Sequence, residues 1–209
     1  MIIENARSLA WPERMALALT DRLTADRNVD RIDYLKCKLA LEVLFINISK
    51  MSVVYALAFV VNAALPTLIF HLAFLSIRVF AYGVHAKSSF VCTLVSTLFF
   101  VGIPWMINAE AVLAPRFVLL LWGIANVLLL MKYAPASTFK NAIGSWEKKR
   151  SLRRKAIRSN IFIIVLIIAL PSLAISNLLM AGSSIAVLLI LPCSYRLFES
   201  TPRKGGNER

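Results

Sequence analysis

His85 and Cys92 are the two residues of this 209-residue chain whose types and spacing could perform chemistry together. A neutral imidazole can take the proton of a nearby thiol, and the resulting thiolate is a strong nucleophile. The pair lies in a short polar stretch, residues 78–92, between two long apolar runs. This combination predicts a cysteine peptidase site at the edge of a lipid bilayer.

The spacing requires a break in the helix between the two residues. On an uninterrupted helix, His85 and Cys92 would share a face but stand about 10.5 Å apart along the axis. Gly83 permits non-helical dihedrals, and Ser88 and Ser89 can cap a following helix. With Ser89 as the N-cap, Cys92 occupies the first helical turn, where the helix dipole favours a thiolate. The free amides of that turn, or the hydroxyls of Ser88 and Ser89, could also stabilise an acyl oxyanion.

A simpler interpretation of the pair remains open at this point. A cysteine in an apolar span is usually small filler, and a histidine at a membrane boundary is often only an interfacial polar residue. Arg78 and Lys87 favour the catalytic interpretation, because nearby positive charge stabilises a thiolate. The sequence does not identify a third residue that would orient His85.

The composition is that of a membrane protein. Hydrophobic residues make up 59% of the chain, and the mean hydropathy is +0.72. The net charge of +13 could suggest nucleic acid, but no aromatic-and-basic binding module accompanies it. We therefore assign the charge to membrane topology and anionic lipid rather than to nucleic acid. The three cysteines are widely separated and form no metal-ligand or disulfide pattern, so we expect no metal and no cofactor.

Six apolar segments predict an all-α, polytopic membrane protein with about six transmembrane helices. They lie at about residues 39–61, 66–80, 90–107, 113–131, 160–176 and 183–198. Residues 1–38 are expected to form a cytoplasmic amphipathic region with a surface helix at about residues 14–23. The transmembrane domain would then cover residues 39–198, and residues 199–209 would form a cytoplasmic tail.

The distribution of lysine and arginine predicts the orientation. Basic residues gather before the first segment, between the second and third, between the fourth and fifth, and in the tail. With six spans and a cytoplasmic N-terminus, all of these regions face the cytoplasm, as the positive-inside rule requires. The three outer turns, expected at about residues 62–66, 108–116 and 177–182, contain one basic residue, Arg116. Both termini are therefore predicted to be cytoplasmic.

Taken with its surroundings, the polar stretch resembles the accessory gene regulator B (AgrB) family. The signature of that family is an arginine, a glycine close before a histidine, Ala-Lys directly after the histidine, and a cysteine seven residues beyond the histidine. Here these are Arg78, Gly83, His85-Ala86-Lys87 and Cys92. Leu41-Glu42-Val43-Leu44 and Lys132-Tyr133-Ala134-Pro135-Ala136 agree as well. The chain departs from the family where Tyr82-Gly83 replaces a frequent Gly-Gly pair and Ser137-Thr138 replaces a common Asp-Thr.

The resemblance implies an integral-membrane cysteine endopeptidase of a Gram-positive bacterium that processes a small quorum-sensing propeptide. His85 and Cys92 would be catalytic, and the processed peptide would close into a thiolactone or lactone. Basic residues would bind the substrate, and the ones selected are Arg78, Lys132, Lys148, Lys149 and Arg150. The alternative for the last three is topology and anionic lipid alone. The alternative for Lys132 is that it extends to the membrane surface without contacting substrate. A homodimer is compatible with the sequence, although no residue pattern predicts it.

A non-catalytic membrane transporter or scaffold for a peptide is the competing interpretation. Transport pathways usually carry buried ionisable or polar residues near the bilayer midplane, and spans three to six contain almost none by sequence. The chain also lacks the paired intramembrane aspartates and the His-Glu-x-x-His helix of other intramembrane proteases.

Overall fold

The computed structural model describes residues 11–25, 29–82, 94–136 and 145–194. Within these residues there is no β-strand, and one isolated bridge joins Tyr82 to Ala136. The helices are α1 (Trp11–Thr24), α2 (Arg31–Val60), α3 (Ala64–Ala81), the π-helical turn η1 (Leu98–Gly102), α5 (Ile103–Asn108), α6 (Arg116–Tyr133), α7 (Trp146–Ala169) and α8 (Leu173–Leu188). The predicted all-α class is confirmed.

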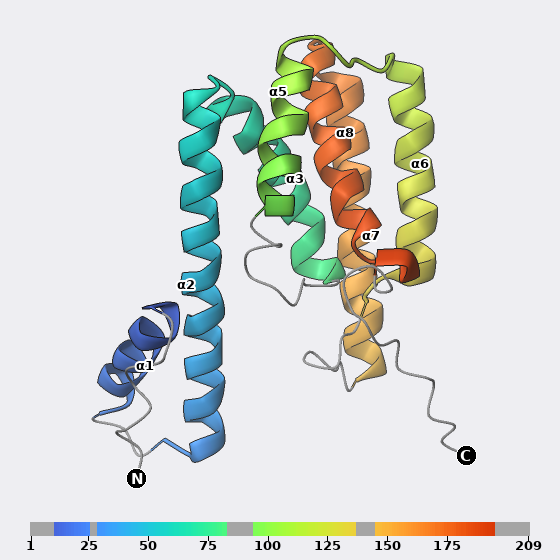
Figure 1. Cartoon of the computed structure of the whole chain (residues 1–209). Coiled ribbons are helices and arrows are strands. Elements are labelled where there is room, and N and C mark those ends of the chain that lie inside the picture. Colours follow the sequence, from blue (N-terminus) through green and yellow to red (C-terminus); the bar gives the residue numbers. More distant parts are fainter. Residues whose placement is uncertain (1–10, 26–28, 83–93, 137–144, 195–209) are drawn as a thin grey trace. The chain divides into compact units, whose positions relative to one another are not determined.

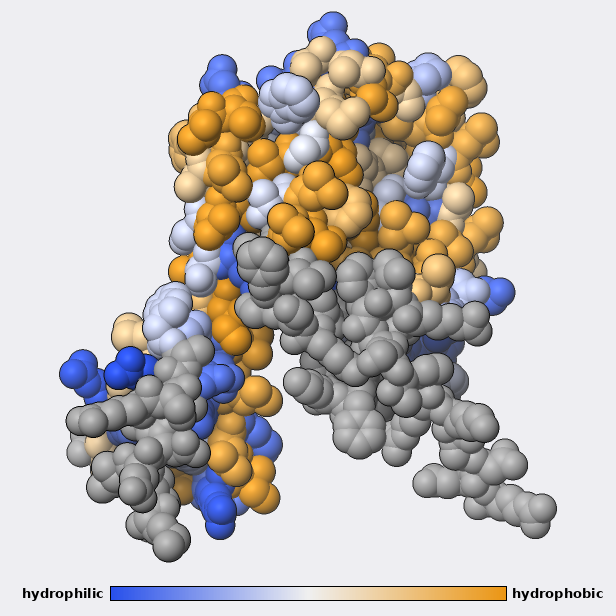
Figure 2. Space-filling model, viewed as in Figure 1, coloured by the Kyte–Doolittle hydropathy of each residue, from blue (hydrophilic) through white to orange (hydrophobic). Residues whose placement is uncertain are grey.

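The first four apolar segments of the sequence overlap α2, α3, the helical stretch Leu94–Asn108 and α6 in that order. Helices α2, α3 and α6 are long and apolar enough to cross a membrane, and Leu94–Asn108 and α8 are shorter apolar helices. Large apolar side chains face outward from the helices, such as Leu72 of α3 at 57%, Leu121 of α6 at 64% and Phe162 of α7 at 62% exposure. Figure 2 shows the resulting hydrophobic surface over α5 and α6. Because soluble proteins rarely expose such extended apolar patches, these faces suit lipid, and the chain is an all-α integral membrane protein.

The chain divides into two compact units, residues 1–56 and residues 57–209. In the first unit, α1 forms the predicted N-terminal amphipathic helix, and the rings of Trp11 and Phe45 stand 6.5 Å apart. Helix α2 begins at Arg31, earlier than the expected start near residue 39. Its first turns are charged but still helical, and Lys36 pairs with Asp33 at 2.9 Å, an i,i+3 contact that supports an exposed helix.

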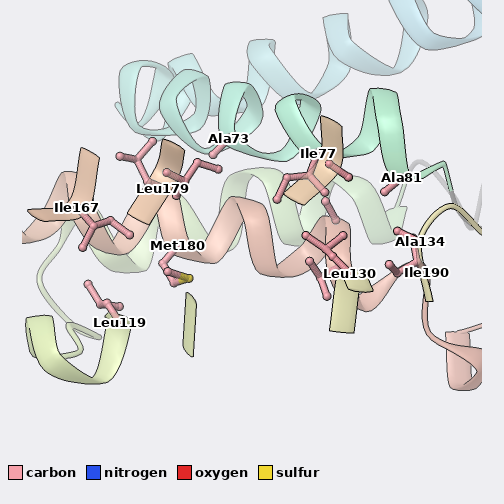
Figure 3. Close-up of a cluster of buried hydrophobic side chains, with 14 residues drawn as sticks. Ala73, Ile77, Ala81, Leu119, Leu130, Ala134, Ile167, Leu179, Met180 and Ile190 are labelled. Carbon is pink, nitrogen blue, oxygen red and sulfur yellow. The ribbon is translucent and has the colours of Figure 1, made fainter. Parts of the chain in front are cut away.

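In the second unit, α3, α6, α7 and α8 pack side by side into a bundle (Figure 1). Helices α3 and α8 lie close together at Gly182, where an added Cβ would lie 2.2 Å from the carbonyl oxygen of Phe70. Small residues allow such approaches between membrane helices, because packing rather than water exclusion holds the helices together. The buried cluster between these helices includes Ile77, Leu130 and Ile167 (Figure 3).

The turn between α7 and α8 lies at residues 170–172, so the outer turn expected at residues 177–182 is wrong. Pro171 cannot continue α7, and the Ser172 hydroxyl accepts a hydrogen bond from the Ile175 amide at 3.3 Å, which caps α8. Asn177 can lie inside α8 because its side chain forms hydrogen bonds there. It accepts from the Ala114 amide at 2.9 Å and donates to the Ala114 carbonyl at 3.1 Å.

Arg116, the basic residue of the expected outer turns, has a local structural role. Its guanidinium donates to the carbonyl oxygens of Leu170 and Pro171 at 2.8 and 2.9 Å. The last carbonyls of a helix have no partner within the helix, so Arg116 satisfies one end of α7 from the start of α6. This contact accounts for a cation outside the regions where the positive-inside rule places one.

A polar network crosses the bundle, so the expectation that spans three to six contain almost no buried polar residue is wrong. Asn126 of α6 donates to the Ser184 hydroxyl of α8 at 3.0 Å, and Asn160 of α7 donates to the Gly123 carbonyl at 3.0 Å. Asn126 is 2% exposed and Asn160 is fully buried. These groups are uncharged and bind neighbouring helices, as expected of polar residues that join membrane helices.

Candidate functional site

The two residues predicted to be catalytic, His85 and Cys92, lie outside the described residues, as do Ser88 and Ser89. The structure does describe the chain immediately before them, which is the end of α3. It also describes the segment after α6, residues 134–136, which belongs to the second stretch that resembles the AgrB family.

Helix α3 ends at Ala81, and its C-cap residue, Tyr82, lies three residues before His85. The Tyr82 amide donates to the Arg78 carbonyl at 3.0 Å, and the Arg78 guanidinium donates back to the Tyr82 carbonyl at 2.5 Å. Arg78 thus satisfies a backbone oxygen at the end of its own helix, where carbonyls lack helical partners. Contact of Arg78 with substrate stays a prediction.

Tyr82 has a backbone conformation that is unusual for a residue with a side chain. Its φ of 57° and ψ of −138° lie in a region that glycine adopts readily and other residues rarely occupy. This is a position where the AgrB family frequently has glycine. The chain leaves α3 in this conformation because the surrounding hydrogen bonds hold Tyr82 on both sides.

The end of α3 pairs with the segment that follows α6. The Ala136 amide donates to the Ala81 carbonyl at 3.0 Å, and Tyr82 and Ala136 form a parallel bridge. Ala81 and Ala134 are buried, and Figure 3 shows them close together at one end of the hydrophobic cluster, beside Ile190. Two of the three stretches on which the family resemblance was based therefore meet in space at their described ends.

Helix α7 contacts both partners of this pairing. The Arg153 Nε atom donates to the Ala134 carbonyl at 2.7 Å, and the Lys155 ammonium lies 5.8 Å from the centre of the Phe80 ring. Arg153 was not selected from the sequence, where it is one of many cations. A usable signal was present, because Arg153 precedes Ala156, Ile157 and Asn160 by three, four and seven residues and so shares their buried helix face.

The basic residues selected as substrate contacts lie at two helix ends. Lys132 is in the last turn of α6, with its ammonium 5.2 Å from the centre of the Tyr133 ring. Lys148 and Arg150 are exposed in the first turns of α7, and Lys149 is half-buried there. The ion pair between Lys36 and Asp33 does not involve this part of α7, whose first turn carries one acidic residue, Glu147.

Comparisons with known proteins place this arrangement in a family. The sequence profile of the family described as accessory gene regulator B matches residues 15–191. The chain belongs to the accessory gene regulator B family. It is 38% identical over 157 residues to accessory gene regulator protein B of Staphylococcus intermedius, covering 75% of this chain and 79% of that protein.

Other members of the family show similar agreement. The chain is 35% identical over 173 residues to accessory gene regulator protein B of Staphylococcus epidermidis, covering 81% of this chain and 86% of that protein. An AgrB-like protein of Listeria monocytogenes serovar 1/2a is 32% identical over 190 residues, which is 90% of each chain. No solved structure matches the chain. Membership of the AgrB family ties this protein to the processing step of accessory gene regulator quorum sensing.

Proposed function

We propose that this AgrB family member is a cysteine endopeptidase of the cell membrane that cleaves a small quorum-sensing propeptide and promotes its cyclisation. The observation that carries the proposal is the family match over residues 15–191, which includes both His85 and Cys92. The pairing of residues 81–82 with Ala136 supports it, because it holds the chain on one side of the reactive segment. The source is proposed to be Gram-positive, as Staphylococcus and Listeria are.

In the proposed reaction, the His85 imidazole takes the proton of the Cys92 thiol, and the thiolate attacks a peptide carbonyl in the propeptide's C-terminal region. The peptide C–N bond breaks, and the leaving amine takes the proton from His85. The remaining propeptide stays on Cys92 as a thioester. A Cys or Ser side chain of the propeptide then attacks that thioester, which frees Cys92 and closes a thiolactone or lactone ring. A site recessed at the membrane limits competing hydrolysis.

The test is the rate at which iodoacetamide alkylates Cys92 as a function of pH. The half-buried Cys37 and the exposed Cys193 are first replaced by Ser, so that Cys92 is the remaining thiol. We expect reaction at a pH well below the ordinary thiol pKa of about 8.5, and a shift toward that value in His85→Ala. A thiol that titrates normally and ignores His85 would contradict a coupled pair.

A second measurement separates the endopeptidase from a transporter or scaffold. The substrate is a short peptide encoded beside this gene, with an amphipathic start, a central Cys or Ser and an acidic end. Cys92→Ser should abolish its cleavage while leaving membrane insertion intact. If cleavage persists in Cys92→Ser, the endopeptidase proposal is wrong.

The basic start of α7 is proposed to bind the acidic end of the propeptide, in addition to anionic lipid. Replacing Lys148, Lys149 and Arg150 by Gln should slow cleavage more at low salt than at high salt, because screening already weakens the attraction at high salt. Arg158→Gln, an exposed change on the same helix, is the matched control. If the variant cleaves as fast as the unaltered protein at both low and high salt, these residues do not bind the propeptide. Their role would then be lipid contact and topology.

We also propose that both termini lie in the cytoplasm, in line with the positive-inside rule. Single cysteines at Glu110 and Lys148, both exposed, test this in a variant whose native cysteines are replaced by Ser. A membrane-impermeant maleimide added to intact cells should label position 110 and not position 148. The reverse labelling pattern would show that the orientation in the membrane is opposite to the one proposed.

A further inference from the structure

Arg153 stands out among the cations of α7 because its side chain is engaged within the bundle. It is half-buried, whereas its neighbour Arg154 is exposed. Its Nε donates to the Ala134 carbonyl at 2.7 Å, a short distance typical of hydrogen bonds with a charged donor. Ala134 is 1% exposed, so its carbonyl has little access to water and would lack a donor without Arg153.

The carbonyl that Arg153 holds belongs to the segment that pairs with the end of α3. Two residues after Ala134, the Ala136 amide donates to the Ala81 carbonyl at 3.0 Å. A second cation of α7, Lys155, lies over the ring of Phe80 in the last turn of α3. Helix α7 therefore contacts both sides of the pairing by independent side chains.

We infer that Arg153 is a positioning residue: it fixes residues 134–136 against the end of α3 and so sets the point from which the chain continues to His85. The inference rests on the proposed function. His85 must come within hydrogen-bond reach of Cys92, and a displacement of about 1 Å originating far from the chemistry can cost about a hundredfold in rate. Tyr82 is three residues from His85, so little chain separates the anchor from the imidazole.

The experiment compares Arg153→Gln with Arg154→Gln, which removes the same charge from an exposed position of the same helix. Amide hydrogen exchange of peptides containing Ala136 reports on the anchor. Loss of a hydrogen bond from a charged donor should speed local opening roughly tenfold in Arg153→Gln and leave Arg154→Gln unchanged. Arg153→Lys, which keeps a charged donor, should restore slow exchange in part.

The pH profile of Cys92 alkylation by iodoacetamide reports on positioning. In protein lacking Cys37 and Cys193, Arg153→Gln should move the profile toward that of His85→Ala, and adding His85→Ala should produce little further shift. Size-exclusion chromatography and circular dichroism in detergent check that each variant is folded. A purely structural role would leave this profile unchanged.

The two measurements separate the ways in which the inference can fail. Equal exchange in the Arg153→Gln and Arg154→Gln variants would overturn the anchor. Faster exchange with an unchanged Cys92 profile would overturn the positioning role and leave the proposed function intact. If Cys92 of the otherwise unaltered protein ignores His85→Ala, the proposed function fails together with the positioning role, while exchange at Ala136 still shows whether Arg153 holds the segment.

Discussion

Replacement of Gly182 by alanine should destabilise the bundle by forcing α3 and α8 apart. A Cβ at this position would lie 2.2 Å from the Phe70 carbonyl oxygen and 3.1 Å from the Ala73 Cβ. An ordinary carbon–oxygen contact is about 3.3 Å, so the helices must separate by about 1 Å. The carbonyl belongs to the backbone of α3 and cannot rotate away as a side chain would. The clash must therefore be relieved by movement of a whole helix.

The size of the effect follows from two opposing terms. Overpacking typically costs about 1–3 kcal/mol, and a rigid backbone acceptor belongs at the upper end of that range. Alanine in place of glycine in a helix returns about 1 kcal/mol. The expected net loss for Gly182→Ala is therefore about 2 kcal/mol. A gap of about 1 Å also forfeits a quarter to a half of each dispersion contact along the interface, which acts in the same direction.

The assay is reversible unfolding in mixed micelles, with two matched glycine variants for comparison. At Gly102 an added Cβ would meet its nearest neighbour, the tip of Leu98, at 3.8 Å, so Gly102→Ala should be neutral or slightly stabilising. At Gly123 an added Cβ would lie 2.8 Å from the Ile164 side chain, which can move aside. The loss of stability in Gly123→Ala should therefore lie between those of the other two variants. The reasoning is refuted if Gly182→Ala is as stable as Gly102→Ala.

Three further experiments test contacts that position the helices and the end of α3. A double-mutant cycle of Asn126→Leu and Ser184→Ala should give a coupling free energy of about 0.6 kcal/mol in micelle unfolding, because polar contacts between membrane helices are modest. Additive effects would mean that their hydrogen bond contributes nothing. Arg116→Gln should lower the free energy of unfolding by about 1.5–3 kcal/mol, the value of hydrogen bonds from a charged donor, with Arg158→Gln as control. Tyr82→Gly should raise stability, since the strain at its backbone is about 1–3 kcal/mol and the entropic cost of glycine is at most about 1 kcal/mol. A less stable Tyr82→Gly would show that contacts of the ring outweigh the strain.

Much of the fold could be predicted because the bilayer makes apolar segments easy to recognise. The first four predicted apolar segments overlap helices in the expected order, and the amphipathic helix near the N-terminus is present. The last two segments are divided differently, because the segment expected at residues 160–176 crosses the turn between α7 and α8. The α7–α8 turn was misplaced because Asn177 and Gly182 were interpreted as turn residues. Asn177 is satisfied by Ala114, 63 residues away, and Gly182 permits a close helix crossing. Neither partner can be recognised from local sequence.

For the candidate site, the reactive residues stay a prediction because they lie outside the described residues, and the described supports were predicted incompletely. His85 and Cys92 were chosen for their chemistry and spacing, which a sequence displays directly. Arg153 was overlooked because a count of cations does not distinguish a half-buried guanidinium from exposed ones. Its partner is a backbone carbonyl, and any residue type supplies one.

Support by main-chain atoms affects where the chain can depart from the family pattern. Tyr82 stands where family members frequently carry glycine, yet its backbone adopts a glycine-like φ of 57°. The conformation is kept because Arg78 binds the Tyr82 carbonyl and Ala136 binds the preceding residue's carbonyl. The backbone of residues 81–82 is thus held by hydrogen bonds to main-chain atoms and depends little on the side chain at position 82. Changes at the donors Arg78 and Arg153 should consequently affect the path of this segment more than changes at Tyr82 itself.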